Sequence, residues 1–355
     1  MTQELTSILQ VRAGRRALSR IRGQGFAPSL FTTWLGASGG PKWLVLSGLD
    51  RVLAARFLPA ARSEVALVGS SIGSWRHACL AQRDPAAAIE RFVDAYIAQR
   101  YEAAPTPAEV TAEAARILDH VLGAHGAAEI VAHPTLRSHV IASRCRGLLG
   151  SERMPVLALA LGLAAACNFV SRRALGLHFE RAVFHTGDAA QVVMHHFTTR
   201  TAPLTERNLR PALLASGAIP LVLAGIADIE GAPAGVYRDG GIVDYHFDFA
   251  MSRPEGLCLF PHFSAEIVPG WFDKQLPWRR LGPALLDDVV ILSPAPELVR
   301  GLSGGKIPDR KDFATLRDDA RMDAWRHAVR QSDHMGDALQ RLLDHPEPAR
   351  FITPL

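Results

Sequence analysis

A strand-to-helix junction at residues 65–79 constrains the fold more than any other feature of the sequence. The segment reads VALVGSSIGSWRHAC, in which an apolar run enters Gly69 and a helix-like stretch follows Gly73. Gly69-x-Ser71-x-Gly73 matches G-x-S-x-G, the pattern of a nucleophile elbow, where a serine occupies a sharp and strained turn. Small flanking residues are needed there because larger side chains would collide with the strand and the helix. We predict that Ser71 is a nucleophile and that Ser70 is a bystander; a plain tight turn is the alternative.

Segments with strand and helix character alternate along most of the chain. The expected strands are at residues 28–40, 64–69, 138–145, 181–186, 191–198, 235–245 and 287–294. The expected helices are at residues 41–58, 74–82, 85–101, 106–123 and 205–220, with Thr106 as a helix cap. Such alternation favours an α/β fold, a three-layer sandwich with a mostly parallel central sheet between helices.

The chain divides into three predicted parts. Residues 1–29 form a basic segment whose arginines and spaced aliphatic residues suggest a short amphipathic helix. Residues 30–300 form the main α/β domain, and residues 301–355 form a charged helical extension that packs on it. Residues 156–170, VLALALGLAAACNFV, are too few to cross a bilayer, which needs about 20 residues, so we expect a buried helix.

Charge and cysteine usage exclude several classes of function. The net charge of +4 is spread over 355 residues, which does not indicate a nucleic-acid partner. The four cysteines show no C-x-x-C spacing, so we expect reduced thiols rather than disulfides or a metal site, and no cofactor. The N-terminus lacks the apolar segment of a secretory signal, and we expect a cytoplasmic protein.

A glycine-rich stretch at residues 36–43, GASGGPKW, is a candidate anion-binding loop. The glycines Gly39 and Gly40 let main-chain N–H groups approach a ligand, and a helix follows at once. A nucleotide-binding loop would need G-x-x-x-x-G-K-[ST], whereas here Pro41 precedes and Trp43 follows Lys42. We therefore interpret the stretch as an oxyanion loop, with chain reversal alone as the alternative.

A third motif lies at residues 237–245, YRDGGIVDY, where Asp239 ends an expected strand and is followed by Gly240 and Gly241. Asp-Gly is also a common hairpin turn, and the local sequence alone favours that interpretation. The order of the three motifs along the chain is what makes Asp239 a candidate base for Ser71.

This order resembles that of the patatin-like lipid acyl hydrolases, which carry G-G-G-x-[RK]-G, then G-x-S-x-G, then D-G-[GA]. The segment LLASGAIPLV, with Ala215, Ser216 and Pro220, also resembles the A-S-x-A-x-P helix end that precedes the aspartate strand in that family. The resemblance covers residues 30–245. Two departures are Ser38 and Trp43, which replace glycines of the first motif, and IVDYHFD in place of the usual continuation after D-G-G.

The resemblance implies a serine–aspartate dyad in which Ser71 attacks an ester carbonyl and Asp239 accepts its proton. It also implies that Gly39 and Gly40 present N–H groups to the oxyanion, with the charge of Lys42 nearby. The expected activity is hydrolysis of lipid esters, of the phospholipase A or lysophospholipase type. The expected partners are a lipid or other acyl ester and, through the basic N-terminus, the inner face of a membrane.

Two alternatives remain at this point. One is an esterase with a Ser-His-Asp triad, in which His246 or His262 would act with Asp239; His77 and the adjacent pair at 195 and 196 are badly placed for this role. The other is a lipid-binding protein that has lost catalysis. The sequence does not distinguish hydrolysis from acyl transfer to another acceptor.

Overall fold

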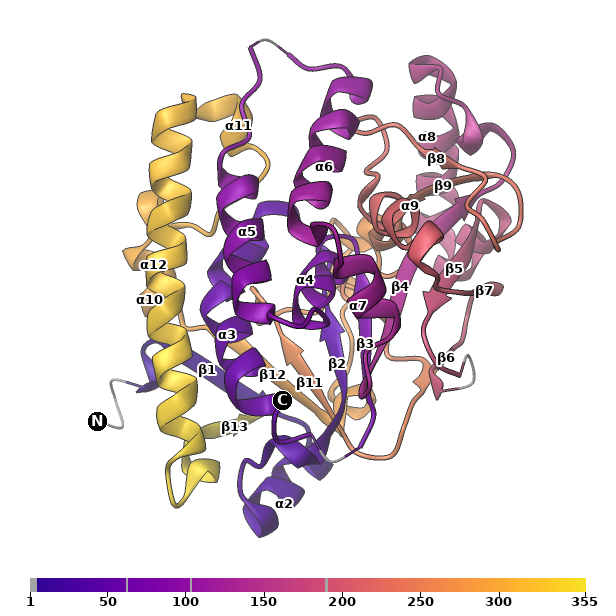
Figure 1. The fold of residues 1–355 in the computed structure, drawn as a ribbon. Coiled ribbons are helices and arrows are strands. Elements are labelled where there is room, and N and C mark those ends of the chain that lie inside the picture. Colours follow the sequence, from indigo (N-terminus) through magenta and orange to yellow (C-terminus); the bar gives the residue numbers. More distant parts are fainter. Residues whose placement is uncertain (1–4, 62, 103, 189–190) are drawn as a thin grey trace.

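The computed structural model describes residues 5–61, 63–102, 104–188 and 191–355. A large sheet forms the centre of the molecule, with helices packed against it (Figure 1). Over the described residues, the sheet runs in the order β13 (Ile352–Pro354), β1 (Leu9–Ala13), β12 (Val289–Pro294), β11 (Leu257–Pro261), β2 (Phe31–Gly36), β3 (Val65–Ser70), β4 (Leu136–Cys145), β5 (Phe179–His185) and β7 (Thr199–Pro203).

The middle of this sheet is parallel. Strands β12, β11, β2, β3 and β4 are successive parallel neighbours, and their residues are almost all buried, as expected for strands covered on both faces. The edges are mixed: β1 and β5 pair antiparallel with β12 and β4. Strand β9 (Val236–Asp239) also pairs antiparallel with β4 and carries β8 (Ile226–Ala227). The predicted α/β class with a mostly parallel central sheet is confirmed.

The helices in chain order are α2 (Arg15–Gln24), α3 (Ser47–Val52), α4 (Ile72–Leu80), α5 (Pro85–Ile97), α6 (Pro107–Leu122), α7 (Gly126–Val131), α8 (Met154–Val170), α9 (Glu206–Gly217), α10 (Pro296–Gly301), α11 (Asp312–Thr315) and α12 (Asp318–Leu343). Helix α6 begins as predicted, because Thr106 and Glu109 form a reciprocal capping box. The expected helix at 41–58 is instead a 3-10 helix, η2 (Gly40–Leu46), then α3 and one π-helical turn (Leu53–Phe57).

The N-terminal segment is not a single amphipathic helix. Leu9, Val11 and Ala13 are buried in alternation with their neighbours, a period of two that suits a strand, and β1 pairs with both β12 and β13. The helix α2 begins only at Arg15. The division into residues 1–29, 30–300 and 301–355 stays a prediction, although the first and last of these parts each add a strand to the same sheet.

Two further expectations are corrected. Residues 191–198 hold only the short β6 (Val193–Met194), which pairs with β10 (Met251–Ser252) outside the main sheet. Helix α8 was expected to be buried, yet Leu159 and Leu163 are 62% and 52% exposed. Among helices in the described ranges, none has both the length and the apolar character needed to cross a membrane. All four cysteines are free thiols.

Candidate active site

Ser71 occupies the turn between β3 and α4. Its backbone has φ 55° and ψ −130°, outside the regions that non-glycine residues prefer, and it is the N-cap of α4. Such a conformation costs on the order of 1–3 kcal/mol and persists only where the surrounding structure holds it. The predicted strained elbow is therefore present, with the positive end of the α4 dipole at the serine.

The glycines around Ser71 are required by close approach of the backbone. A Cβ atom on Gly73 would lie 2.0 Å from the carbonyl oxygen of Gly36, at the end of the neighbouring strand β2. A Cβ atom on Gly69 would lie 2.5 Å from the Cα atom of Ser74. The spacing G-x-S-x-G thus lets the start of α4 pack directly on the ends of β2 and β3, as the sequence predicted.

Strand β4 brings Asp239 to Ser71. In the register of the sheet, Ser70 pairs with Ile141 and Asp239 pairs with Ala142, the next residue of β4. Strands β3 and β9 lie on the same side of β4, because β5 occupies its other side. The Ser71 Oγ–H donates to Asp239 Oδ2 at 2.6 Å, and the Gly241 N–H donates to Oδ1 at 2.6 Å. Both oxygens of the carboxylate therefore have a donor.

Burial controls the acidity of Asp239. Loss of water raises its pKa to about 6, while the donors on Ser71 and Gly241 and the positive charges of Arg310 and Lys274 lower it. At neutral pH the carboxylate is therefore mostly ionised, with a pKa close to the working pH. These properties suit a general base.

Ser216, at the end of α9, holds the elbow in place. Its hydroxyl accepts the Ser71 N–H at 2.9 Å, donates to the Ile141 carbonyl at 2.6 Å and lies 2.7 Å from Ser74 Oγ. The Ser74 hydroxyl is also 2.6 Å from the carbonyl of Ser71. The motif A-S-G-A-I-P contains Ser216, but the sequence did not predict this role.

The loop before η2 supplies free N–H groups beside Ser71. Gly39 and Gly40 are the N-cap and first residue of η2, where N–H groups have no partner within the helix. Both residues, together with Ser71 and Asp239, line one cavity. Ile72, at the first position of α4, lines the same cavity, and its N–H is a third candidate donor.

The two departures from the glycine motif each have a structural role. The Ser38 N–H donates to the Tyr245 carbonyl at 2.9 Å and is not available to a ligand, while its hydroxyl donates to Ser70 Oγ at 3.0 Å. Trp43 is buried and stacks on Phe92 with ring centroids 4.1 Å apart. The Ser70 hydroxyl is thus occupied in a contact away from Asp239.

Lys42 lines the cavity as expected, but its charge is shared. The ammonium group forms an ion pair with Asp309, which is 267 residues away in the sequence. The sequence did not predict this carboxylate, which the segment before α11 brings against Lys42.

The continuation after Asp239 is fixed by a buried ion pair. Gly240 and Gly241 lie so close to Ile141 and Ser38 that a Cβ atom on either would be within 2.5 Å of an oxygen. Asp244 then accepts two hydrogen bonds from Arg181 on β5, at 2.6 and 2.8 Å, and both side chains are fully buried.

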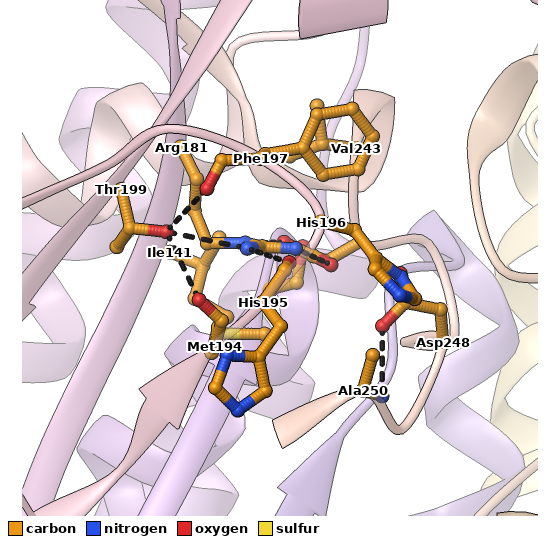
Figure 2. A network of polar contacts seen from close by, with 12 residues as sticks. Ile141, Arg181, Met194, His195, His196, Phe197, Thr199, Val243, Asp248 and Ala250 are labelled. Atoms are coloured by element: carbon orange, nitrogen blue, oxygen red, sulfur yellow. Dashed lines mark hydrogen bonds and ion pairs between the residues drawn. The ribbon is translucent and has the colours of Figure 1, made fainter. Parts of the chain in front are cut away.

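Figure 2 shows the other contacts of Arg181: it also donates to the His195 carbonyl and to Thr199 Oγ1, and His196 approaches Asp248 nearby. The residues IVDYHFD therefore anchor the Asp239 turn to β5 through Asp244.

The cavity that contains Ser71 and Asp239 has a volume of about 980 Å³. Its apolar lining includes Ile72, Trp75, Val110, Ile117, Ile219 and Leu223. The segment IPLVLAGI therefore contributes to the cavity, whereas no residue of α8 does so among the described lining residues.

Histidines lie away from the reacting groups. Within the described ranges, no histidine lines the cavity or bonds to Ser71 or Asp239. His246 Nδ1 accepts the N–H of Val268 at 3.1 Å, and burial lowers its pKa well below the ordinary value. His262 bonds to the backbone of Ser264. This arrangement favours the dyad over the triad.

Groups of three or more histidine, cysteine or acidic side chains that could hold a metal ion are not found among the described residues. Comparison of the chain with family models, with curated proteins and with solved structures finds no match in any of the three.

Proposed function

We propose that this protein is a serine acyl hydrolase of the patatin-like type that cleaves carboxylic esters of lipids. The observation that carries the proposal is the 2.6 Å hydrogen bond from Ser71 Oγ to a buried aspartate at a strained elbow. The free N–H groups of Gly39 and Gly40 in the same cavity support it.

In the first half of the reaction, Ser71 Oγ attacks the ester carbonyl carbon while Asp239 Oδ2 takes its proton. The carbonyl oxygen becomes negative and is stabilised by the N–H groups of Gly39, Gly40 and Ile72. The carbon–oxygen bond to the alcohol then breaks, and the protonated Asp239 gives its proton to the departing alkoxide. An acyl-serine remains.

In the second half, water enters the position of the alcohol. Asp239 accepts a proton from this water, the hydroxide attacks the acyl carbon, and the bond to Ser71 Oγ breaks with return of the proton to the serine. The apolar lining at Ile219 and Leu223 holds the acyl chain in this scheme. The four free thiols support a reducing compartment such as the cytoplasm as its location.

A panel of esters tests this proposal. Wild type and Ser71→Ala are incubated with phospholipids, lysophospholipids and neutral esters, and the released fatty acid is measured. The proposal expects release by the wild type from at least one class and none above background from Ser71→Ala. Failure of the wild type on every ester, or release by Ser71→Ala, would overturn it.

A further inference from the structure

Two cations in the cavity have no carboxylate within ion-pair distance among the described residues. Lys274, which follows the 3-10 helix η8 (Trp271–Asp273), and Arg310, which precedes α11, are both half-buried and line the cavity with Ser71. Neither forms an ion pair or a side-chain hydrogen bond with any described residue. In contrast, the buried arginines Arg76 and Arg181 each have a bidentate aspartate.

Both cations lie beside the reacting groups. The Lys274 ammonium is 3.9 Å from the centre of the Tyr245 ring, and the aliphatic stem of Arg310 lies next to Gly40 of the oxyanion loop. Their charges act on Asp239, whose pKa each of them lowers. Burial lowers the pKa of Lys274 to about 8, and the charge of Arg310 lowers it further, while the carboxylates of Asp239 and Asp309 raise it. The carboxylates of Asp239 and Asp309 offset the repulsion between the two cations only from beyond ion-pair distance, so an anion bound directly between the two cations would reduce it further.

The rest of the cavity fits the other end of an amphiphile. The apolar lining residues Ile72, Ile219 and Leu223 share the cavity with these cations, and Ser71 lines it too. An acyl chain against these apolar residues would place its ester in the same cavity as Lys274 and Arg310.

We propose that Lys274 and Arg310 form a subsite for an anionic group, a phosphate or a carboxylate, of the acyl substrate. This inference rests on the proposed hydrolase function and extends it to a preference for anionic over zwitterionic and neutral lipids. Lys42 is not the main contact, because Asp309 already neutralises it.

Binding to the Ser71→Ala protein tests the subsite without any turnover. Isothermal titration with dodecyl phosphate, laurate, dodecylphosphocholine and dodecyl maltoside, each below its micelle concentration, measures the four affinities. The subsite predicts tighter binding of at least one of the two anions than of the other two ligands. It also predicts that Lys274→Met and Arg310→Gln each lower the affinity for that anion at least about tenfold. The affinity for dodecyl maltoside should stay unchanged in both variants. Arg22→Gln, on exposed α2, is the control that should bind all four like the parent.

The outcomes separate the two proposals. Equal affinities for all four ligands would overturn the subsite proposal. An equal loss of affinity for the anion and for dodecyl maltoside in the two variants would overturn it as well. If the wild type cleaves no ester but the anion selectivity depends on Lys274 and Arg310, the subsite stands and the hydrolase proposal fails. The ratio of dodecyl phosphate to laurate affinity then identifies which anionic group the site prefers.

The exposed side of α8 is apolar, and it supports a second, independent inference. Leu159, Leu163, Phe169 and Val170 are all more than half exposed, and α8 has no charged residue from Met154 to Val170. Exposed Trp278 lies against Phe169, with ring centroids 5.8 Å apart. A contiguous apolar surface of this kind marks an interaction site.

Positive charge borders this apolar surface. Arg153 precedes α8 and Arg173 follows it; both are exposed, and neither has an ion-pair partner among the described residues. On the buried side, α8 packs in the same apolar cluster as Ile242, which lines the cavity. In Figure 1, α8 lies at the same end of the molecule as α11 and the start of α6, where the cavity is.

We infer that the α8 surface docks on an anionic lipid bilayer, with the apolar residues in the interface and the arginines on the headgroups. Sedimentation with vesicles of phosphatidylglycerol and phosphatidylcholine, and with phosphatidylcholine alone, measures the binding. Leu159→Gln/Leu163→Gln should reduce partitioning to the anionic vesicles at least about tenfold. Leu285→Gln, an equally exposed leucine elsewhere, should not.

Sedimentation velocity tests the main rival occupant, a second copy of the chain. If the wild type is a dimer, the Leu159→Gln/Leu163→Gln protein is a monomer, and both proteins bind the vesicles equally, the docking inference is wrong. Absence of wild-type binding to anionic vesicles would contradict it as well. A melting temperature within a few degrees of wild type shows that the variant is folded.

Discussion

Ser71 and Asp239 are 168 residues apart in the sequence, and a 2.6 Å hydrogen bond joins their side chains where β3 and β9 meet along one side of β4. The serine belongs to a local strand–turn–helix unit, whereas the aspartate reaches it only because β9 pairs with β4. The active arrangement therefore depends on the register of the sheet. The predictions below follow from this contact and from the residues that hold it.

Removing either member of the pair should abolish ester turnover. Ser71→Ala and Asp239→Asn are each expected to lower kcat/KM about a thousandfold or more, since a general base and its nucleophile act as one unit. The double variant should be no worse than the worse single variant. Ser70→Ala should retain most activity, because the neighbouring hydroxyl bonds to Ser38 instead. Additive losses in the double variant would show that the two side chains act separately.

The pH profile should report Asp239. Its pKa of about 6 predicts that kcat/KM falls about tenfold per pH unit below pH 6, as the base becomes protonated. Arg310→Gln removes a positive charge that favours the carboxylate, so the acid limb should move to higher pH. The measurement is kcat/KM on a neutral soluble ester from pH 4.5 to 9. An acid limb that stays unchanged in Asp239→Glu and in Arg310→Gln would assign it to another group.

Asp239 should also lower the stability of the fold at neutral pH. Its pKa is higher in the folded state than the ordinary value of 3.8, so the folded protein binds more protons and loses stability as pH rises from about 4 to 6. Asp239→Asn should therefore be more stable than wild type at pH 8, by on the order of 3 kcal/mol, with the difference vanishing near pH 4. Urea unfolding at the two pH values measures this. A variant that is less stable at pH 8 would contradict the role of burial.

Ser216 should affect the rate through the position of Ser71. Ser216→Ala leaves the Ser71 N–H without its acceptor and is expected to cost about 1–3 kcal/mol of stability, and to lower kcat with little change in KM. Ser332 is a matched control, because its hydroxyl accepts the Gly48 N–H, contacts Ser47 and donates to a carbonyl in the same way. Ser332→Ala should lose similar stability without losing kcat. Equal kcat losses in both variants would indicate a general effect of destabilisation.

The buried pair of Arg181 and Asp244 should be costly to break. Arg181→Met leaves an uncompensated buried carboxylate and is expected to destabilise the protein by about 3–5 kcal/mol. Arg181→Met/Asp244→Leu should recover part of this loss, since both charges are then gone. Chemical denaturation compares the three proteins. A double variant less stable than Arg181→Met would show that Asp244 has a further essential contact.

The local part of the site could be predicted from the sequence. The elbow at Ser71 requires only that a strand enters and a helix leaves a turn with glycines at fixed positions, and Gly69 and Gly73 meet the backbone as expected. Asp239 was different. Its own segment favoured a hairpin turn, and only the order of the three motifs along the chain pointed to it.

The contacts that the sequence could not predict are long-range. The pairing of Lys42 with Asp309, and the approach of Lys274 and Arg310 to Asp239, depend on how the chain after residue 245 folds back over the cavity. That part of the chain resembled no family. Strand β1 was missed because five residues with alternate burial give a weak signal beside a helix of arginines.

Helix α8 shows a limit of another kind. Its composition alone indicates an apolar environment, and burial in the protein was the expected one. The exposed fractions of Leu159 and Leu163 show that the protein itself does not cover this side. Hydropathy therefore predicts that a helix prefers an apolar environment, but it does not predict whether the protein itself or a binding partner provides that environment.

Covalent labelling with a fluorophosphonate, followed by mass spectrometry of the peptides, tests the central claim most directly, because the reagent requires an activated serine. We predict one adduct on Ser71 in the wild type, none in Ser71→Ala, and a labelling rate about a hundredfold or more lower in Asp239→Asn. An adduct on another serine, or equal labelling rates in wild type and Asp239→Asn, would contradict the account.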